Sequence, residues 1–368
     1  MNSRSDLQEA LTHCIAQRLT FAAFRRPGQG QVTLWAQQTP ELDRVEPGLL
    51  WEMNDVFLIA PFREEKRIPL IRSDVELTFG DAAPAWHRLL ECAGSANELA
   101  EERRLETSRH QFESAVDQAR KACSLGELEK VVLSRTVLIG TNKADAPLLF
   151  TTAVLERTEA FVAICYTPEY GLWLGASPER LVLAENDTVR MDALAATRPR
   201  SSAPEDAMQW TEKERHEQGV VTKGITATLI DIGARTILIE GPDVLLTAGL
   251  AHLHTRISAA LEGRAIEDLV TQLHPTPAVC GIPKEIARSH IHAWEDRERE
   301  LYAGYWGPWS ADGRMELFVN IRCMRLFSDR AELHVGAGIT SGSNPVLEWE
   351  ETEHKADGWR SLLQPTAV

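Results

Sequence analysis

The succession of strand-like segments is the feature that most constrains the fold of this chain. Residues 130–139, Lys-Val-Val-Leu-Ser-Arg-Thr-Val-Leu-Ile, are rich in β-branched residues and end at Gly140. Other segments of this kind lie at residues 32–35, 56–60, 160–166, 172–174, 181–184, 316–327 and 331–335. They follow one another without regular alternation with helices. This order predicts an α+β fold of mainly antiparallel β-sheets with outer helices, rather than a doubly wound parallel sheet.

The longer helices are predicted from spacing and capping residues. One begins near Ser108, a suitable N-cap, because Phe112, Val116 and Ala119 recur at helical spacing. Another spans residues 212–232. Residues 91–106 are polar and acidic, which predicts a surface connection. Because no low-complexity linker or fixed-period repeat divides the chain, we expect a single domain over residues 1–368.

Composition excludes several classes of protein. The net charge of −15 opposes a nucleic-acid partner, which needs a basic surface, but allows a small anionic substrate in a local pocket. The six cysteines include no Cys-x-x-Cys pair, which is typical of thiols in a reducing compartment. Residues 1–10 read as a short amphipathic helix rather than a signal peptide, and no segment approaches about 18 apolar residues. We therefore expect a cytoplasmic protein without a membrane span.

Two pairs of glutamates indicate a cation site. Glu348 and Glu351 follow a glycine-rich segment that reads as a turn, and Lys355 lies one helical turn beyond them. Glu214 and Glu217 repeat the spacing of three residues, which places two side chains on one helix face. Two such helices would offer carboxylates to one Mg²⁺ that keeps open positions for water and a substrate oxygen. For either pair alone, a solvated helix surface is the alternative.

Further motifs occur in an order that matches a known family. They are the run Trp-Leu-Gly-Ala-Ser-Pro-Glu-Arg at 173–180, Ala-Leu-Ala-Ala-Thr-Arg-Pro-Arg at 193–200, Leu-His-Pro-Thr-Pro-Ala-Val-Cys-Gly-Ile-Pro at 273–283, Tyr-Ala-Gly at 302–304 and Val-Asn-Ile-Arg at 319–322. With these motifs, the sequence from about Phe112 onward closely resembles the chorismate-utilising enzymes, and among them the isochorismate synthases. The motifs lie in residues 108–368, whereas residues 1–107 match loosely, as a variable N-terminal part of the same domain. The resemblance implies the chorismate-binding enzyme fold.

The resemblance also implies roles for individual residues. The catalytic pair is Lys130, which activates the nucleophile, and Glu179, the general acid. The implied magnesium ligands are Glu217 and Glu351, with Glu214 and Glu348 supporting them or reaching the ion through water. The implied substrate contacts are Thr197, His252, His274, Tyr302, Arg322, the amides of Gly336 and Gly338, and Lys355. For His274, a core histidine is the alternative interpretation. Two positions depart from the family, with Ala196 where glycine is usual and Gln218 where histidine is common.

The implied reaction is the Mg²⁺-dependent, reversible conversion of chorismate to isochorismate. Water is added at ring C2 and the C4 hydroxyl is lost, so one group must remove a proton while another donates one. A salicylate synthase, which goes on to eliminate pyruvate, carries the same residues and remains an alternative. An ammonia-using anthranilate or aminodeoxychorismate synthase is less well matched, because those relatives tend to lack a lysine at position 130.

Two non-enzymatic alternatives are a chorismate sensor and a plain metal-binding domain. A sensor needs neither Lys130 nor Glu179, so the presence of both argues against it. We expect chorismate as the small-molecule partner, no amidotransferase subunit and a monomer. Isochorismate feeds siderophore, menaquinone and salicylate synthesis, and the sequence does not choose among these pathways.

Overall fold

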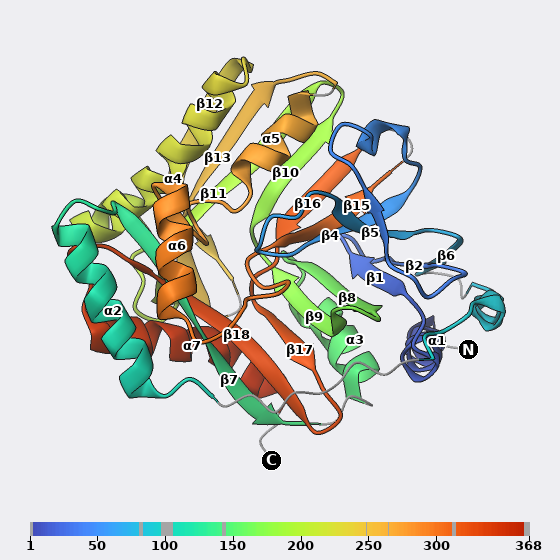
Figure 1. Cartoon of the computed structure of the whole chain (residues 1–368). Coiled ribbons are helices and arrows are strands. Elements are labelled where there is room, and N and C mark those ends of the chain that lie inside the picture. The colour runs from blue at the N-terminus through green and yellow to red at the C-terminus, as the bar shows by residue number, and fades with distance from the viewer. Residues whose placement is uncertain are drawn as a thin grey trace.

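The computed structural model describes residues 3–80, 84–96, 106–141, 145–247, 249–263, 265–310 and 314–363. Most of the predicted connection at 91–106 therefore lies outside the described residues. Within them, the strands form two sheets in which every strand pair is antiparallel. The prediction of an α+β fold with mainly antiparallel sheets is thus confirmed (Figure 1).

Strands that are far apart in the sequence are neighbours in both sheets. In order across the sheet, the first consists of β14 (Gly281–Ile282), β7 (Lys130–Gly140), β18 (Arg330–Ile339), β17 (Cys323–Leu326), β9 (Gly171–Ser177), β8 (Phe161–Thr167), β1 (Phe21–Arg25), β2 (Val32–Ala36) and β6 (Val75–Phe79). The second consists, in the same way, of β12 (Arg235–Leu246), β13 (Leu250–Ala260), β11 (Thr188–Pro199), β10 (Arg180–Glu185), β16 (Met315–Val319), β15 (Tyr305–Trp309), β4 (Val56–Ala60), β5 (Ile68–Arg72) and β3 (Asp43–Val45). Strands from the N-terminal part of the chain thus belong to both sheets.

The helices surround these sheets. They are α1 (Ser3–Gln17), α2 (Arg109–Ser124), α3 (Ala146–Glu156), α4 (Glu212–Asp231), α5 (Ala265–Leu273), α6 (Lys284–Trp294) and α7 (Pro345–Leu363), with short 3₁₀ helices η1 (Leu50–Glu52), η2 (Trp86–Glu91) and η4 (Ala207–Gln209). Figure 1 shows α2, α4 and α6 on the left of the molecule and α1 at the far right. No described helix is long and apolar enough to span a membrane.

The main core lies between the two sheets. Phe161 of β8 stacks on Phe318 of β16, with ring centroids 4.2 Å apart and an angle of 5° between the rings. Residues of α2, α4, α5 and α6 belong to the same buried cluster. A second cluster lies on the other face of the first sheet, where α1, α3 and α7 cover it. Because burial of apolar surface is the main favourable term in folding, these two layers hold the sheets in place.

Capping residues explain where two helices begin. Ser108 accepts a hydrogen bond from the backbone of Gln111, whose side chain bonds back to the Ser108 backbone, and α2 starts immediately after it. Thr211 and Glu214 form the same reciprocal pair at the start of α4. Each pair satisfies backbone N–H groups that have no partner within the helix. The predicted helices at 108 and at 212–232 are confirmed.

Two of the points at which the chain crosses from one sheet to the other are neighbours in the structure. Pro178 and Glu179 connect β9 of the first sheet to β10 of the second, and the three residues after β16 lead back to β17. The two crossings are hydrogen-bonded to each other, from the Val319 N–H to the Glu179 carbonyl and from the Ala176 N–H to the Arg322 carbonyl, both at 3.0 Å. Each crossing therefore fixes one candidate site residue, Glu179 or Arg322.

Two predictions about strands are wrong. The segment 316–327 is not one strand, because Arg322 has a φ of 51° and the chain turns there into the other sheet. The glycines at 336 and 338 do not form a turn but belong to β18, opposite Ser134 and Val132 of β7. The turn comes later, at residues 341–342.

Candidate active site

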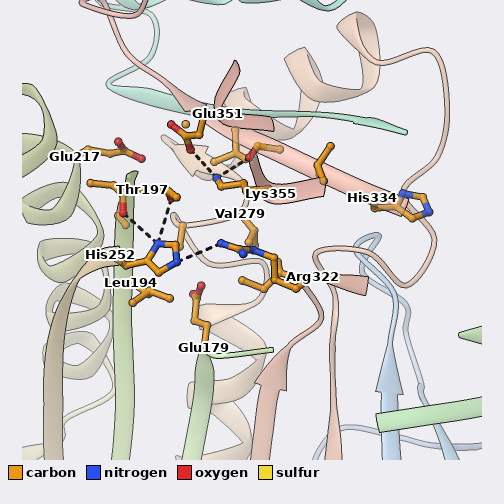
Figure 2. Close-up of a pocket in the computed structure, with 18 of the residues that line it drawn as sticks. Glu179, Leu194, Thr197, Glu217, His252, Val279, Arg322, His334, Glu351 and Lys355 are labelled. Carbon is orange, nitrogen blue, oxygen red and sulfur yellow. Dashed lines mark hydrogen bonds and ion pairs between the residues drawn. The ribbon is translucent and has the colours of Figure 1, made fainter. Parts of the chain in front are cut away.

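A pocket of about 640 Å³ lies where β7, β18, β11, α4 and α7 meet the two crossings. Its lining includes most of the predicted site residues: Lys130, Glu179, Thr197, Glu217, His252, Tyr302, Arg322, Gly336, Gly338, Glu351 and Lys355. Figure 2 shows Glu179 on the side of the pocket opposite Glu217 and Glu351. The structure thus brings together residues that are more than two hundred positions apart in the chain.

Lys130 is the first residue of β7, and its side chain is buried. Its ammonium group lies 3.0 Å from a carboxylate oxygen of Glu217 on α4. Gly338, on the neighbouring strand β18, leaves the space that this pair occupies. A Cβ built at Gly338 would collide with the Glu217 carboxylate and lie 2.9 Å from Cε of Lys130. Glycine is therefore required at position 338 because the side chains of Glu217 and Lys130 lie close to its backbone, and not because the chain turns there.

Glu351 forms a second carboxylate–lysine pair on the same side of the pocket. Its carboxylate accepts a hydrogen bond of 2.6 Å from Lys355, one turn further along α7. Lys355 also donates to the carbonyl of Gly336 at 2.8 Å, which fixes the ammonium group at the pocket wall. Glu217 and Glu351 are therefore each paired with a lysine in this structure.

The other two predicted acids do not face the pocket. Glu214 accepts two hydrogen bonds from Arg198, at 2.6 and 2.7 Å, and also caps α4 through Thr211. Glu348 is buried against Lys213, 2.7 Å away, and burial followed by the charge of Glu351 raises its pKa. The prediction that all four acids share one point is corrected: the pocket receives two of them. Among the described residues, no group of three or more His, Cys, Asp or Glu is placed to hold a metal.

Glu179 lies at the first crossing and is 3% exposed. Burial raises the pKa of its carboxyl group to about 8, and the negative charge of Asp192 acts in the same direction. The cations Lys130, Lys355 and Arg322 act in the opposite direction but do not cancel this effect. Because a carboxyl group with this pKa is mostly protonated at neutral pH, Glu179 can donate a proton.

Arg322 is held at the second crossing with its guanidinium directed into the pocket (Figure 2). Its carbonyl accepts a hydrogen bond of 2.8 Å from the indole of Trp359 on α7. Burial, followed by repulsion from Arg157, lowers its pKa to about 10, so it stays charged at neutral pH. Its left-handed backbone conformation is uncommon for a residue with a side chain, which is typical of functional positions.

His252 on β13 supports Arg322 from behind. Arg322 donates to Nε2 of His252 at 3.2 Å, and burial followed by the charge of Arg322 lowers the pKa of the imidazole well below its usual value. The ring is therefore neutral. Its Nδ1 lies 3.2 Å from both the Ala196 carbonyl and the Thr197 hydroxyl. Because a carbonyl only accepts, the proton belongs on Nδ1, leaving Nε2 to accept from the arginine.

Tyr302 is buried, and its hydroxyl lies beside Gly336, where a Cβ would come within 2.6 Å. Its ring stacks on His334, with centroids 5.3 Å apart, and His334 stacks in turn on Trp173 at 5.2 Å. His334 lines the pocket but was not predicted, because a lone histidine within a strand carries no motif.

One predicted substrate contact, His274, lies outside this pocket. Its Nε2–H donates to the Pro61 carbonyl at 2.8 Å, and its ring packs edge-on against Tyr305. Burial lowers its pKa to about 4, so it is a neutral core histidine. The prediction of a substrate contact is wrong, and the alternative interpretation of this residue holds.

Comparison with known proteins identifies the family. The family model described as chorismate binding enzyme matches residues 81–364. The chain belongs to the chorismate-binding enzymes. It is 32% identical over 272 residues to isochorismate synthase DhbC of Bacillus subtilis (strain 168), which covers 70% of this chain and 68% of that protein. It is 31% identical over 255 residues to isochorismate synthase EntC of Escherichia coli (strain K12), covering 66% of this chain and 64% of that protein. The match thus spans about two thirds of the length of these relatives.

Two solved structures show the same fold over nearly all of this chain. A putative 2,3-dihydroxybenzoate-specific isochorismate synthase, DhbC from Bacillus anthracis, has a TM-score of 0.79 at 24% identity, covering 97% of this chain and 99% of that chain. The menaquinone-specific isochorismate synthase MenF from Escherichia coli has a TM-score of 0.77 at 23% identity, covering 96% and 91%.

The two departures from the chorismate-binding family have different surroundings. Ala196 has a φ of 57° and lines the pocket, in a conformation that glycine adopts without strain. Gln218 is buried and points away from the pocket, donating to the Ala193 carbonyl at 2.9 Å and to Thr255 at 3.0 Å. Gln218 therefore ties α4 to the second sheet.

Proposed function

We propose that the protein is an isochorismate synthase, which converts chorismate to isochorismate reversibly. The observation that carries this proposal is the placement of two groups on opposite sides of one pocket. Lys130 lies beside Glu217, and Glu179, whose pKa is about 8, lies on the other side. The reaction adds water at one ring carbon while a hydroxyl leaves another. It therefore needs a base on one side of the substrate and an acid on the other. The names of the relatives support this choice of reaction.

The substrate would be held by its two carboxylates. Arg322 and Lys355 are the cations that line the pocket beside Lys130. The amides of Gly336 and Gly338 are also candidates, because the residues opposite them, Ser134 and Val132, donate their N–H groups to Glu295 and to the Cys280 carbonyl rather than to β18. Arginine suits a carboxylate because its planar group donates two parallel hydrogen bonds.

The residues present fit a Mg²⁺ ion. Mg²⁺ is usually bound by one or two carboxylates and keeps several waters, and Glu217 and Glu351 are two carboxylates that face the same side of the pocket. When bound, the ion would neutralise a carboxylate of the substrate and help to orient it. We therefore propose Glu217 and Glu351 as its ligands, with Glu348 behind them and Glu214 excluded by its contacts with Arg198.

In the forward direction, Lys130 would first have to lose its ammonium proton, and its neutral amine would then take a proton from the water that attacks C2. Glu179, on the other side of the ring, would donate a proton to the C4 hydroxyl as it leaves. One water is consumed and one is released, so the atoms balance. In the reverse direction, Glu179 becomes the base and Lys130 the acid. Because His252 is neutral, it accepts a hydrogen bond from the guanidinium of Arg322 and adds no second positive charge beside it.

A product assay tests the proposal. The purified protein is incubated with chorismate and Mg²⁺ in the absence of ammonia and glutamine, and the products are separated by chromatography. We expect isochorismate to accumulate until it reaches equilibrium with chorismate. Accumulation of salicylate and pyruvate instead would identify a salicylate synthase, and absence of any product would reject both.

The pH dependence of the reaction follows from the raised pKa of Glu179. Since the acid form donates the proton, the forward rate should fall as the pH rises through about 8. Removing the charge of Asp192, as in Asp192→Asn, lowers this pKa and should move the alkaline limb of kcat to lower pH. Asp243→Asn serves as the control, because Asp243 lies on the exposed strand β12, where it pairs with Arg256 of the neighbouring strand β13. An alkaline limb unmoved in Asp192→Asn would contradict the assignment of Glu179.

Gly338→Ala tests the packing of the Lys130–Glu217 pair. The added methyl would displace two flexible side chains rather than backbone, so folding should survive while activity falls by about tenfold or more. In the control Gly140→Ala, on β7, a Cβ meets no atom within 4 Å, and activity should be retained. Melting temperatures and kcat of both variants are the measurements. Normal kcat in Gly338→Ala would show that the position of this pair is unimportant.

The predictions of a cytoplasmic location, a monomeric state and the absence of an amidotransferase subunit remain predictions. The pathway that uses the product also remains open, since relatives such as DhbC and MenF serve different ones.

A further inference from the structure

A second cavity, of about 850 Å³, adjoins the first pocket. Arg322 and Lys355 line both spaces, so the two cavities meet at the side chains assigned to the substrate carboxylates. The rest of its lining comes from the end of α3 and the segment between α3 and β8, from the end of β9 and the crossing after it, from the ends of β11 and β12, and from α7. The proposed reaction uses none of the other residues that line this second cavity.

The charged side chains that line the second cavity are mainly cationic. Its charged residues are Arg157, Arg200, Arg322 and Lys355, together with Glu156 and Glu159. The excess of positive charge contrasts with the net charge of −15 for the whole chain. Because a concave surface of one sign focuses the electric field, such a cavity raises the local concentration of anions of small size.

Arg157, which lines this cavity, is held by contacts with α7. Its guanidinium donates to the Gly358 carbonyl and lies over the Trp359 ring, 5.6 Å from the centroid. Its Nε is buried and has no hydrogen-bond partner among the described residues. Arg157 is also one of the charges that lower the pKa of Arg322, and both residues line this cavity. Two cations that line one cavity favour the binding of an anion there.

Arg200 lies at the outer side of the cavity. It directly follows β11, its side chain is exposed, and its backbone N–H donates to the Gly249 carbonyl at 2.9 Å. No described side-chain contact of Arg200 supports the fold. Arg200 therefore offers its charge to the cavity rather than to packing, and it can be replaced without disturbing a buried group.

We propose that the second cavity is the entrance through which an anionic substrate reaches the first pocket, with Arg157 and Arg200 as the cations that attract it. The inference rests on the proposed function, because it takes the two carboxylates of chorismate as the attracted charge. It adds to that function a route of access and two residues that the reaction itself does not need.

Charge variants test the entrance at two ionic strengths. At about 0.02 M salt, Arg200→Gln should raise KM for chorismate about two- to threefold with kcat unchanged. Glu159→Gln, which removes a negative charge from the same cavity, should lower KM by a similar factor. The control is Arg190→Gln, because Arg190 is also exposed but lies near the opposite end of β11, and its KM should stay that of the wild type. At about 0.5 M salt, where charges are screened within a few ångströms, the differences should disappear.

The proposal is overturned if KM at low salt is the same in Arg200→Gln and the wild type, or if a difference persists unchanged at high salt. The wild-type assay separates this outcome from failure of the proposed function. If the wild type turns chorismate over but KM does not change in Arg200→Gln or Glu159→Gln, the proposed entrance is rejected and the proposed function stands. If the wild type does not turn chorismate over, the dissociation constant of chorismate, measured by calorimetry on the same variants, replaces KM in the same comparison.

Discussion

Lys130→Ala is expected to abolish the conversion of chorismate to isochorismate and the reverse conversion together. A positioned acid or base contributes about 10²- to 10⁴-fold to rate, and Lys130 would act as base in one direction and as acid in the other. Binding of chorismate should survive, because the carboxylates are assigned to Arg322 and Lys355. Initial rates from both substrates, with calorimetric affinity for chorismate, are the measurements.

A matched control is available for this variant. Lys284 also forms a pair with a glutamate, Glu64, at 3.1 Å, but lies outside the pocket. Lys284→Ala should retain near-normal rates in both directions. If Lys130→Ala still converted isochorismate back to chorismate at a near-normal rate, the paired roles of Lys130 and Glu179 would be wrong.

Glu217→Gln and Glu351→Gln are expected to lose activity by about 100-fold or more at limiting Mg²⁺. Each change removes a hard anionic oxygen from an ion that depends on few protein ligands. Both acids line a pocket rather than the core, so the variants should remain folded. The rate as a function of Mg²⁺ concentration is the measurement, and the concentration for half-maximal activity should rise in both.

Glu214→Gln tests whether the Mg²⁺ site uses only the two acids that line the pocket or all four acids predicted from their spacing. Glu214 lies three residues before Glu217 on the same helix but is engaged by Arg198 and Thr211. Glutamine retains the cap of α4, so we expect a normal Mg²⁺ requirement and a small loss of stability. A Mg²⁺ requirement that rose equally in Glu214→Gln and Glu217→Gln would contradict the placement of only two acids in the pocket.

Local sequence predicted most of the elements that carry the site. The β-branched run at 130–139 forms β7, and the caps Ser108 and Thr211 mark the starts of α2 and α4. These features depend on neighbours within a few residues, which is the range over which capping and strand propensity act. The strands β1, β3, β5, β6 and β11 to β15 were not predicted. In β12, most side chains are exposed and the pair Gly241-Pro242 breaks the strand pattern.

What the sequence did not show was which contacts form over long distances. The turn at Arg322, which separates β16 from β17, carries neither glycine nor proline. The glycines of β18 looked like a turn because the side chains that need their space, Lys130 and Glu217, lie far away in the chain. For Glu214, a local signal was present: the spacing Thr211-x-x-Glu214 is that of a capping box.

The spacing of motifs alone also misplaced His274 and missed Asp192. His274 occurs in a motif near the site, but the pocket is reached by Val279, a few residues later. Asp192 belongs to β11, and its effect on Glu179 depends on the pairing of β11 with β10, the strand that begins directly after Glu179. Tertiary contacts of this kind decide the pKa of a buried acid, and local pattern does not report them.

If water attacks one ring carbon while Glu179 helps the hydroxyl to leave another, the new hydroxyl oxygen of isochorismate must come from the solvent. The most direct test is to run the reaction with chorismate and Mg²⁺ in ¹⁸O-labelled water and to measure the mass of the isochorismate formed early in the reaction. We predict one ¹⁸O atom in each isochorismate molecule, at the C2 hydroxyl, and no exchange in Lys130→Ala or Glu179→Gln. Isochorismate that forms without the label, or no isochorismate at all, would contradict this mechanism.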